Sequence, residues 1–354
     1  MIKKICFFST SFAMHKQVRL KYAERYLPKD IQIFLLTPAA HNKYKLKRAE
    51  VIEISGSKIN FVLELRRFCK KNRIDLLTNL GTINESFGMV FATFGLKTKY
   101  IINFIGNIWD ITKLQNKSKN LFLFIKKIFL AIPFIFAKKI IQPSPDLADK
   151  TKKYYPFTKS RVFHTPLIVD EKLFSPKDKA SARKKLKLPI KKDIILSVGR
   201  VSYLKGSDIL IELAKKNPDK LFIIVGEIID KTYEKERLPN LVLIHSVKGK
   251  ELADYYNSAD LFIFPSRIEA YGMVHREAMS CETPSLISDI PALGLTEHAL
   301  KSKPNAEEMQ IQLDKFFSMS EKERKKLGKI SRGYILKENS YNSLKEIHKE
   351  LLLS

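Results

Sequence analysis

Two acidic side chains stand eight positions apart within residues 264–284, FPSRIEAYGMVHREAMSCETP. The apolar run that ends at Phe264 is short and rich in aromatic and branched residues, which predicts a buried strand. Glu269 then lies in the loop that leaves this strand, whereas Glu277 lies in a stretch of helical spacing that follows Gly272. A loop carboxylate is suited to binding hydroxyl groups, and a helix carboxylate is suited to binding a diol.

The start of the helix predicted after Gly272 is also a candidate anion site. Backbone N–H groups at a helix start, here those of Gly272, Met273 and Val274, lack partners within the helix and lie at the positive end of its dipole. Amides for a phosphate and carboxylates for hydroxyls together indicate a nucleotide-sugar pocket. The two glutamates alone are a weak signal, because a solvated loop and a dipole-favoured helix glutamate give the same spacing.

A second cluster, SVGRVSYLKG at residues 197–206, strengthens this interpretation. It also follows an apolar run, at residues 194–198, and it also precedes a helical stretch. Its Arg200 and Lys205 are cations beside a glycine turn, which suits the binding of a diphosphate. The second half of the chain therefore contains two predicted phosphate sites, each between a strand and a helix.

The two clusters occur in a context that is similar to a known enzyme family. The chain reads SVGR and KG, then LADYYNSADLFIFPS, and then Glu269, Gly272, EAM at residues 277–279 and Pro284. This series resembles the retaining glycosyltransferases of family four, also called group one, and it stays in register over residues 163–317. The resemblance implies the GT-B architecture, in which two Rossmann-like α/β domains face each other across a cleft.

The alternation of apolar runs with helical stretches independently predicts parallel sheets flanked by helices, and 354 residues suffice for two domains. We expect an acceptor-binding domain over residues 1–170 and a donor-binding domain over residues 171–335. We expect a carboxyl-terminal helical segment over residues 336–354 to return to the first domain, with an amphipathic helix over residues 341–353. The last strand of the first domain is expected at residues 140–144.

The resemblance also implies roles for individual residues. Arg200, Lys205 and Glu269 are the implied catalytic residues: the cations stabilise the leaving nucleoside diphosphate, and Glu269 binds sugar hydroxyls. A double displacement would instead need a carboxylate, such as Glu269, beneath the anomeric carbon. Donor binding is implied for Gly199, Val247, Gly272, Met273, Val274 and Glu277. In this group Val247 lies in the loop that reads the base edge, and Glu277 holds the ribose.

The implied reaction moves a hexosyl group from a nucleotide-diphosphate sugar to a hydroxyl of an envelope glycan or a lipid-linked acceptor, with retention of anomeric configuration. Polysaccharide and lipopolysaccharide biosynthesis use such reactions. We expect no cofactor and no metal, because the sequence has no suitably placed Asp-x-Asp and no His or Cys cluster with ligand spacing. The nucleotide sugar is a substrate.

The first half of the chain departs from the family pattern at two places. Ser9, Thr10 and Ser11 stand where family members often have a glycine-rich loop, so the features of that loop do not carry over. No histidine follows the apolar run at residues 99–105, where the family usually has one near the reacting sugar. Asn103, Asn107 and Asp110 are candidates for that space, and the acceptor-activating base stays unassigned.

Charge is concentrated in the first half. Residues 1–176 hold 32 basic and 12 acidic residues, a balance of +20, whereas residues 177–354 hold 32 and 25, a balance of +7. This asymmetry predicts a polyanionic partner for the first half. Residues 113–139 combine apolar and basic residues, and are too short and too charged at the centre for a comfortable span. They predict either an interfacial helix on an anionic leaflet or a core helix with snorkelling lysines.

The three cysteines are far apart, and we expect buried thiols in a reducing compartment. No convincing signal peptide is present, so we expect a cytoplasmic protein, peripheral on the inner face of the plasma membrane. Two other classes stay open. A non-catalytic relative acting as a partner subunit would explain the departures, and a nucleic-acid-binding protein would explain the net charge of +27. The second lacks interleaved aromatic residues and any DNA-binding motif, so we expect no nucleic-acid partner.

Overall fold

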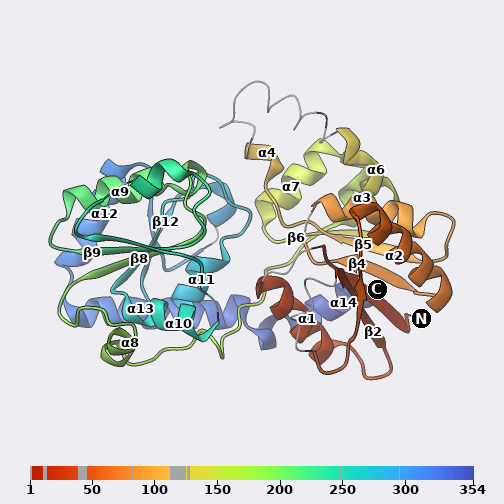
Figure 1. Ribbon diagram of the computed structural model, residues 1–354, viewed down its shortest axis with the longest axis horizontal. Helices are drawn as coiled ribbons and strands as arrows, with labels where there is room; N and C mark the ends of the chain where they lie inside the picture. Colours follow the sequence, from red (N-terminus) through yellow and green to blue (C-terminus); the bar gives the residue numbers. More distant parts are fainter. Residues whose placement is uncertain are drawn as a thin grey trace. The chain divides into compact units, whose positions relative to one another are not determined.

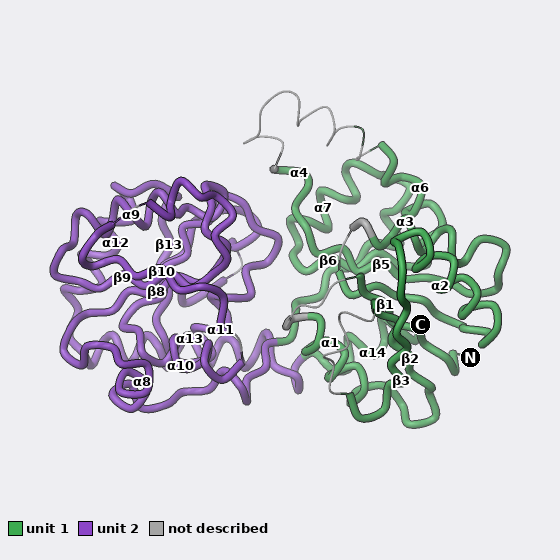
Figure 2. Tube along the Cα trace, in the orientation of Figure 1, with its two compact units in different colours: residues 1–168, 344–354 green, residues 169–343 purple. Residues whose placement is uncertain are grey.

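The structure is a computed structural model that describes residues 2–10, 14–38, 46–81, 83–111, 125, 128–235, 237–247, 249–294 and 296–354. The chain forms two compact units (Figure 2). Unit 1 comprises Met1–Ile168 and Leu344–Ser354, and unit 2 comprises Val169–Ser343. The boundary expected after residue 170 lies two residues beyond this division.

Unit 1 contains a parallel seven-stranded sheet of order β3-β2-β1-β4-β5-β6-β7. Its strands are β1 (Lys4–Phe8), β2 (Gln32–Pro38), β3 (Glu50–Ile54), β4 (Leu76–Asn79), β5 (Lys99–Asn103), β6 (Lys139–Gln142) and β7 (Val162–His164). The strand expected to be last is β6, and that expectation is wrong, because β7 follows and pairs Val162 with Ile140. Three residues are too few to show a strand period in the sequence.

Helices cover the unit-1 sheet (Figure 1). They are α1 (Met14–Tyr26), α2 (Lys58–Asn72), α3 (Ile83–Thr93), α4 (Ile108–Ile111), α6 (Ala131–Phe136), α7 (Pro145–Tyr154) and the 3-10 helix η3 (Pro156–Arg161). In α2 the buried residues Phe61, Leu65 and Cys69 repeat every four positions and so form one core-facing stripe. The Ser57 side chain caps this helix by accepting from the Asn60 amide at 3.2 Å.

The carboxyl-terminal helix α14 (Tyr341–Leu353) ends in unit 1. Leu351 and Leu352 join the core beside β1, and Lys139 Nζ donates to the Leu351 carbonyl at 3.0 Å. The preceding helix α13 (Glu321–Asn339) continues past residue 336. The segment expected over residues 336–354 therefore also contains the end of α13, whereas the helix expected over residues 341–353 is confirmed as α14.

Unit 2 contains a parallel six-stranded sheet of order β10-β9-β8-β11-β12-β13. Its strands are β8 (Ile194–Val198), β9 (Leu221–Val225), β10 (Leu241–Ile244), β11 (Leu261–Phe264), β12 (Ser285–Ser288) and β13 (Leu300–Ser302). Every residue of β8, β9, β11 and β12 is buried. Strands of a parallel sheet covered on both faces have this continuous burial, as the apolar runs predicted.

The helices of unit 2 alternate with these strands. They are α8 (Lys179–Lys185), α9 (Ser207–Lys216), α10 (Lys250–Ser258), α11 (Met273–Ser280), α12 (Ala306–Ser318) and α13, with 3-10 helices η4 (Tyr203–Lys205), η5 (Lys231–Lys235) and η6 (Pro291–Leu293). A capping box begins α13, since Ser320 and Glu323 bond each other's backbone amides. All three cysteines of the chain are free and buried, as expected.

Candidate functional site

The strand order of unit 2 fixes where a ligand would bind. From β8 the chain moves to β9 and β10 on one side, and then crosses to β11 on the other side of β8. In open parallel sheets ligands bind beyond the carboxyl ends of the two strands at such a switch point. Gly199, Arg200 and Lys205 follow β8, whereas Glu269 and Gly272 follow β11. The topology therefore brings both sequence clusters to the switch point.

The loops after β8 and β11 contact each other. Lys205 Nζ forms an ion pair with Glu269 Oε1, and their side chains are 20% and 11% exposed. Ser266 Oγ donates to the same Glu269 oxygen at 3.1 Å. The sequence analysis gave Lys205 and Glu269 separate tasks, and the structure shows that they are direct partners. The cation of the loop after β8 and the carboxylate of the loop after β11 therefore neutralise each other.

Phe264 connects this ion pair to the start of α11. Its ring centre lies 5.8 Å from Lys205 Nζ and 5.7 Å from the ring centre of His275. His275 in turn lies beneath Gly272, where an added Cβ would be 2.7 Å from the imidazole. Lys205, Glu269 and the amino end of α11 are therefore held together by a packed aromatic contact.

Arg276 fixes the backbone that enters α11. Its buried guanidinium stacks 3.8 Å from the Tyr271 ring centre and donates to the carbonyls of Tyr271 and Gly272, and to Thr296 Oγ1 at 3.0 Å. Gly272 is left-handed, with φ of +70°. Met273 and Val274 are half-buried, so their amides begin the helix close to solvent. Sequence reasoning missed Arg276, because a single arginine in a helix carries no motif.

His275 is a structural residue. It is fully buried, and its Nε2 lies 3.2 Å from Thr296 Oγ1 and 2.9 Å from an Arg276 nitrogen. Burial, together with the Arg276 charge, holds the pKa of His275 far below its ordinary value. We infer that His275 is present at this position of α11 because its neutral imidazole packs against Gly272.

Glu277 extends the site along α11. Tyr256 of α10 donates its hydroxyl to Glu277 Oε2 at 2.9 Å. Burial raises the pKa of the Glu277 carboxyl to about 7, against the opposing effect of the tyrosine hydrogen bond. Tyr256 is a second residue that the sequence analysis missed, although it lies within the matched LADYYNS stretch.

The remaining expected residues lie at the same edge of the sheet. The Gly199 amide donates to the Val225 carbonyl at 2.9 Å, so the loop after β8 stays paired to β9 beyond the strands. Arg200 is exposed, and within the described part of the chain its guanidinium makes no ion pair. Val247 follows β10 and is half-buried. Among the described contacts, none of these three residues forms an ion pair or a side-chain hydrogen bond with Lys205 or Glu269.

Comparison with known proteins agrees with this geometry. Residues 178–334 match the profile of the family described as "Glycosyl transferases group 1". This part of the chain is a group 1 glycosyltransferase domain. The resemblance found in the sequence is thereby confirmed for the unit that contains the site.

Three similar proteins illustrate the match. A D-inositol 3-phosphate glycosyltransferase of Xylanimonas cellulosilytica is 31% identical over 126 residues, which are 32% of this chain and 30% of that protein. The chain thus spans about a third of that relative's length. Sucrose-phosphate synthase of Thermosynechococcus elongatus has a TM-score of 0.80 at 18% identity, covering 99% of this chain and 98% of the other. Anabaena HepE in complex with UDP and glucose has a TM-score of 0.79 at 15% identity, covering 99% and 100%. These likenesses show a GT-B fold built from two Rossmann-like units.

The raised pKa of Glu277 predicts that donor binding to the glycosyltransferase domain depends on pH. If Glu277 holds the ribose, as expected from the sequence, its ionised carboxylate accepts from both ribose hydroxyls, whereas the protonated form loses an acceptor. If only the ionised form binds, UDP affinity measured by titration calorimetry should be about tenfold higher at pH 8 than at pH 6, given the pKa of about 7.

The matched variant for this test is Glu277→Gln, which cannot ionise. It should leave only the pH dependence that comes from the diphosphate itself, whose last proton has a pKa of about 6. If UDP affinity changes with pH equally in the wild type and in Glu277→Gln, the role of Glu277 in binding the ribose is contradicted. The same shift affects folding with a known sign. Because the native carboxyl binds its proton more tightly than the unfolded one, stability contributed by Glu277 falls as pH rises from about 4.5 to about 7.

Unit 1 has its own polar cluster where its strand order reverses, between β1 and β4. Lys16 Nζ lies 3.2 Å from Glu85 Oε1 and 2.9 Å from Ser9 Oγ, and all three side chains are buried. Glu85 also accepts from the Thr10 amide at 2.9 Å. These contacts hold residues 9 and 10, which replace the expected glycine-rich loop, whereas Ser11 lies outside the described residues.

The three residues considered for the acceptor side have different environments. Asn103 is buried and donates to Thr78 Oγ1 at 2.8 Å and to the Asn79 carbonyl at 2.9 Å. Asp110 accepts from Lys150 Nζ and, at 2.9 Å, from Asn107 Nδ2. A carboxylate that is paired with a lysine is a poor base, so the geometry leaves the acceptor-activating group unassigned.

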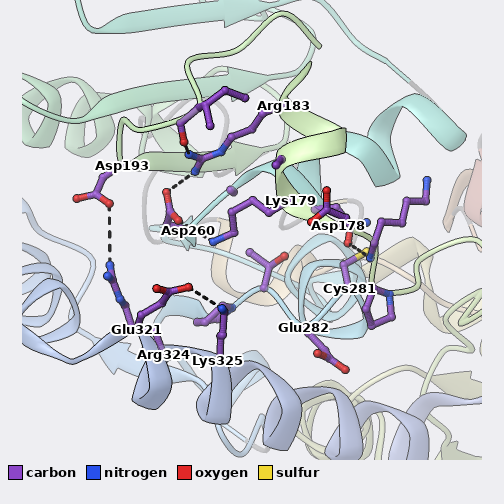
Figure 3. Close-up of a pocket in the computed structure, with 18 of the residues that line it drawn as sticks. Asp178, Lys179, Arg183, Asp193, Asp260, Cys281, Glu282, Glu321, Arg324 and Lys325 are labelled. Atoms are coloured by element: carbon purple, nitrogen blue, oxygen red, sulfur yellow. Dashed lines mark hydrogen bonds and ion pairs between the residues drawn. The ribbon is translucent and has the colours of Figure 1, made fainter. Parts of the chain in front are cut away.

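A separate cavity of about 610 Å³ lies at the opposite edge of the unit-2 sheet, where β8, β11 and β12 begin. Its charged lining comes from α8, α13 and the segments that enter these strands (Figure 3). No residue of the expected donor site lines it. The cavity therefore belongs to the packing of α8 and α13, and not to the donor pocket.

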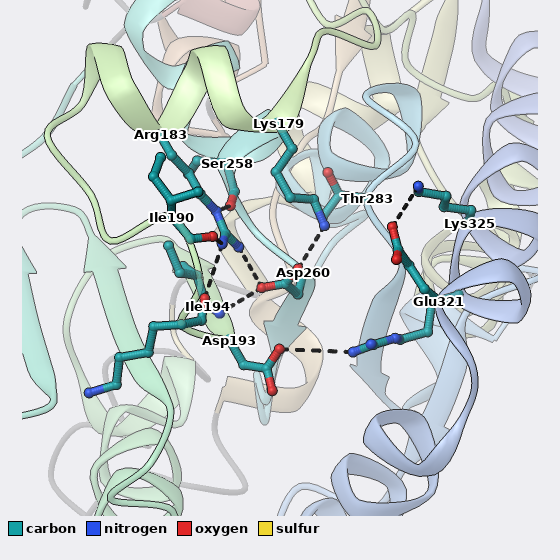
Figure 4. A network of polar contacts seen from close by, with 12 residues as sticks. Lys179, Arg183, Ile190, Asp193, Ile194, Ser258, Asp260, Thr283, Glu321 and Lys325 are labelled. Atoms are coloured by element: carbon teal, nitrogen blue, oxygen red, sulfur yellow. Dashed lines mark hydrogen bonds and ion pairs between the residues drawn. The ribbon is translucent and has the colours of Figure 1, made fainter.

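Asp260 is the centre of the polar network beside this cavity (Figure 4). It accepts from Lys179 Nζ at 2.7 Å, from Arg183 at 2.6 Å and from the Ile194 amide at 2.8 Å. Although burial opposes it, Lys179, then the Ile194 amide and then Arg183 hold the pKa of Asp260 below its ordinary value. Arg183 also donates to three backbone carbonyls, so this network ties α8 to the strand starts.

Proposed function

We propose that the protein transfers a hexosyl group from a nucleotide-diphosphate sugar to a hydroxyl of an envelope glycan or lipid-linked acceptor, with retention of configuration. The bond from the anomeric carbon to the β-phosphate oxygen breaks, and the acceptor oxygen bonds to the same face of that carbon. The acceptor proton leaves with the diphosphate or to solvent. The observation that carries the proposal is the meeting of Lys205, Glu269 and the start of α11 at the switch point.

Each expected residue has a task in this reaction. Lys205 and Arg200 neutralise the charge that develops on the leaving diphosphate, and the amides of Gly272, Met273 and Val274 bind its oxygens. Glu269 orients sugar hydroxyls, and Glu277 holds the ribose. Gly199 and Val247 shape the floor and the base end of the pocket.

We propose that these fixed charges take the place of a divalent metal and that no cofactor is needed. Among the described residues no group of three His, Cys, Asp or Glu side chains is arranged to hold a metal. In this proposal Lys205 and Arg200 supply the positive charge that a divalent metal would otherwise supply. Addition of a chelator is expected to leave turnover unchanged.

The acceptor is the least constrained part of the proposal. Two relatives carry names that point to phosphorylated acceptors or products, a D-inositol 3-phosphate glycosyltransferase and a sucrose-phosphate synthase. A soluble sugar phosphate is therefore the alternative to the lipid-linked acceptor of polysaccharide or lipopolysaccharide synthesis. The lipid-linked acceptor is favoured by the basic balance of +20 in residues 1–176.

The proposed location is the cytoplasm, at the inner face of the plasma membrane. None of the helices in the described ranges has the length and apolar content needed to cross a bilayer. Residues 113–124 and 126–127 of the segment expected to bind the membrane lie outside the described residues. Its described remainder includes α6.

Thermal unfolding with a panel of nucleoside diphosphates tests the donor pocket. HepE was solved with UDP, so UDP is the first member of the panel, followed by ADP and GDP. A ligand at 100 times its Kd stabilises the native state by about 2.7 kcal/mol. For a domain of this size that predicts a rise in Tm of roughly 5–10 °C.

The alternatives predict other results. Stabilisation by an oligonucleotide alone would favour the nucleic-acid class, and binding of a diphosphate without turnover of any nucleotide sugar would favour a non-catalytic partner subunit. No response to any diphosphate would contradict the donor pocket itself.

A further inference from the structure

Unit 1 exposes large hydrophobic side chains on three neighbouring elements. Helix α3 packs against α6, and α6 packs against η3 (Figure 1). We call the exposed apolar residues of these elements the outer face; their side chains are 43% to 71% exposed. They are Phe91, Phe94, Ile132, Ile135, Phe136 and Phe157.

The outer face is not needed for the core of unit 1. In α6 the inward residue Phe134 is fully buried and packs against the rings of Phe104 and Tyr155. Tyr100 anchors the same helix by donating to the Pro133 carbonyl at 2.6 Å. Helix α6 is thus apolar on both its buried and its exposed sides. Exposed apolar side chains gathered on elements that pack against one another mark a surface that binds something.

Basic residues border the outer face, and acidic residues are scarce there. Residues 86–169 hold 14 Lys and Arg but 3 Asp and Glu, a balance of +11. Two of those acids, Asp110 and Asp146, are paired with Lys150. No acid occurs in residues 86–109, 111–145 or 150–169, which include α6, η3 and all but the first turn of α3.

Several of these cations lie next to the exposed aromatic side chains. Arg161 donates to the Ile135 carbonyl at 2.9 Å and also to Ala137, so its guanidinium lies at the end of α6. Lys97 and Lys99 follow Phe94 and are exposed. Lys138 lies just after the end of α6, and burial, with a smaller effect of the charge of Lys99, lowers its pKa.

We propose that the outer face docks on an anionic lipid bilayer, with its aromatic residues in the headgroup–acyl boundary and its lysines and arginines among the headgroups. A protein interface would combine both charge signs around its apolar centre. An apolar patch whose neighbouring charges are mostly cations matches an anionic leaflet. The inference rests on the proposed function only in that a lipid-linked acceptor gives the enzyme a reason to be at a membrane.

Vesicle flotation tests the docking without measuring catalysis. The full chain should float with vesicles of phosphatidylglycerol and phosphatidylcholine, and binding should fall at least tenfold with phosphatidylcholine alone or in 1 M salt. The double variant Phe94→Ser/Phe136→Ser should bind at least tenfold more weakly. The charge variant Lys97→Gln/Lys99→Gln/Lys159→Gln should also bind at least tenfold more weakly, because it removes three cations that would lie among the anionic headgroups.

The matched control is Ile311→Ser, which removes an equally exposed hydrophobic side chain from α12 in unit 2. It should float like the wild type, and thermal unfolding should show that all variants remain folded. Wild-type binding by the Phe94→Ser/Phe136→Ser variant, or no binding to anionic vesicles, would overturn the proposal. So would a wild-type dimer in sedimentation that this variant loses, because the face would then bind a second copy. UDP binding, measured on the same variants, reports separately on the donor site.

Discussion

Replacing Lys205 with alanine is expected to lower turnover by about 10²–10³-fold while leaving the protein folded. Removal of one preorganised group that faces developing charge has an effect of this size in other enzymes. Lys205 has the required position, because it lies at the switch point beside Phe264 and the start of α11. The measurement is release of nucleoside diphosphate at saturating nucleotide sugar, with circular dichroism to confirm the fold.

The control variant is Lys216→Ala. Lys216 also pairs with a glutamate, since its Nζ lies 3.0 Å from Glu212 Oε1, but this pair is on α9 and largely exposed. An exposed ion pair contributes at most about 1 kcal/mol to stability, so Lys216→Ala should change neither stability nor turnover appreciably. Equal turnover in the two variants would contradict the role of Lys205.

The contact between Lys205 and Glu269 makes a sharper prediction. In Lys205→Ala the Glu269 carboxylate loses its cation and would face the incoming diphosphate with an uncompensated charge. Adding Glu269→Gln should therefore restore part of the UDP affinity that Lys205→Ala loses, without restoring turnover. If the loss of UDP binding free energy in the double variant equals the sum of the losses in the two single variants, the two side chains do not act on the same ligand.

How much of this arrangement the sequence predicts depends on whether a contact is local. The loop after β11 and the start of α11 are adjacent in the chain, so Glu269, Gly272 and Glu277 could be placed from spacing alone. The ion pair of Lys205 with Glu269 joins residues 64 positions apart. No local pattern encodes that contact; it follows from β8 and β11 being neighbours in the sheet.

The residues that were missed are those whose chemistry depends on tertiary burial. Tyr256 lies in the matched LADYYNS stretch, but the sequence does not show that its hydroxyl contacts Glu277; that contact forms because α10 packs against α11. In the sequence Arg276 is indistinguishable from an ordinary charged residue of a helix, and only the fold shows that it is buried against Tyr271. In unit 1, hydrophobic periodicity could not predict the strand β7, because three residues are too few to show a repeat. It could not predict the pairing of Lys16 with Glu85 either, because these residues are 69 positions apart.

Gly206→Ala is expected to have the largest effect on stability of the substitutions considered. Gly206 is left-handed, with φ of +72°, and a Cβ there would lie 2.3 Å from the Pro265 carbonyl oxygen. A left-handed alanine alone is unfavourable by about 1–2 kcal/mol. Because the obstructing atom is backbone, the loops after β8 and β11 must also separate. We expect a loss of about 2–4 kcal/mol, measured by urea unfolding.

The same substitution at Gly333 is the control, and its effect should have the opposite sign. Gly333 lies inside α13, its backbone is not left-handed, and a Cβ there would meet no atom within 4 Å. Alanine at such a position stabilises a helix by about 0.5–1 kcal/mol. Separation of the two loops also moves Lys205 away from Glu269, so Gly206→Ala should weaken UDP binding as well as the fold. A Gly206→Ala protein with wild-type stability and UDP affinity would show that these loops do not form the site by contacting each other.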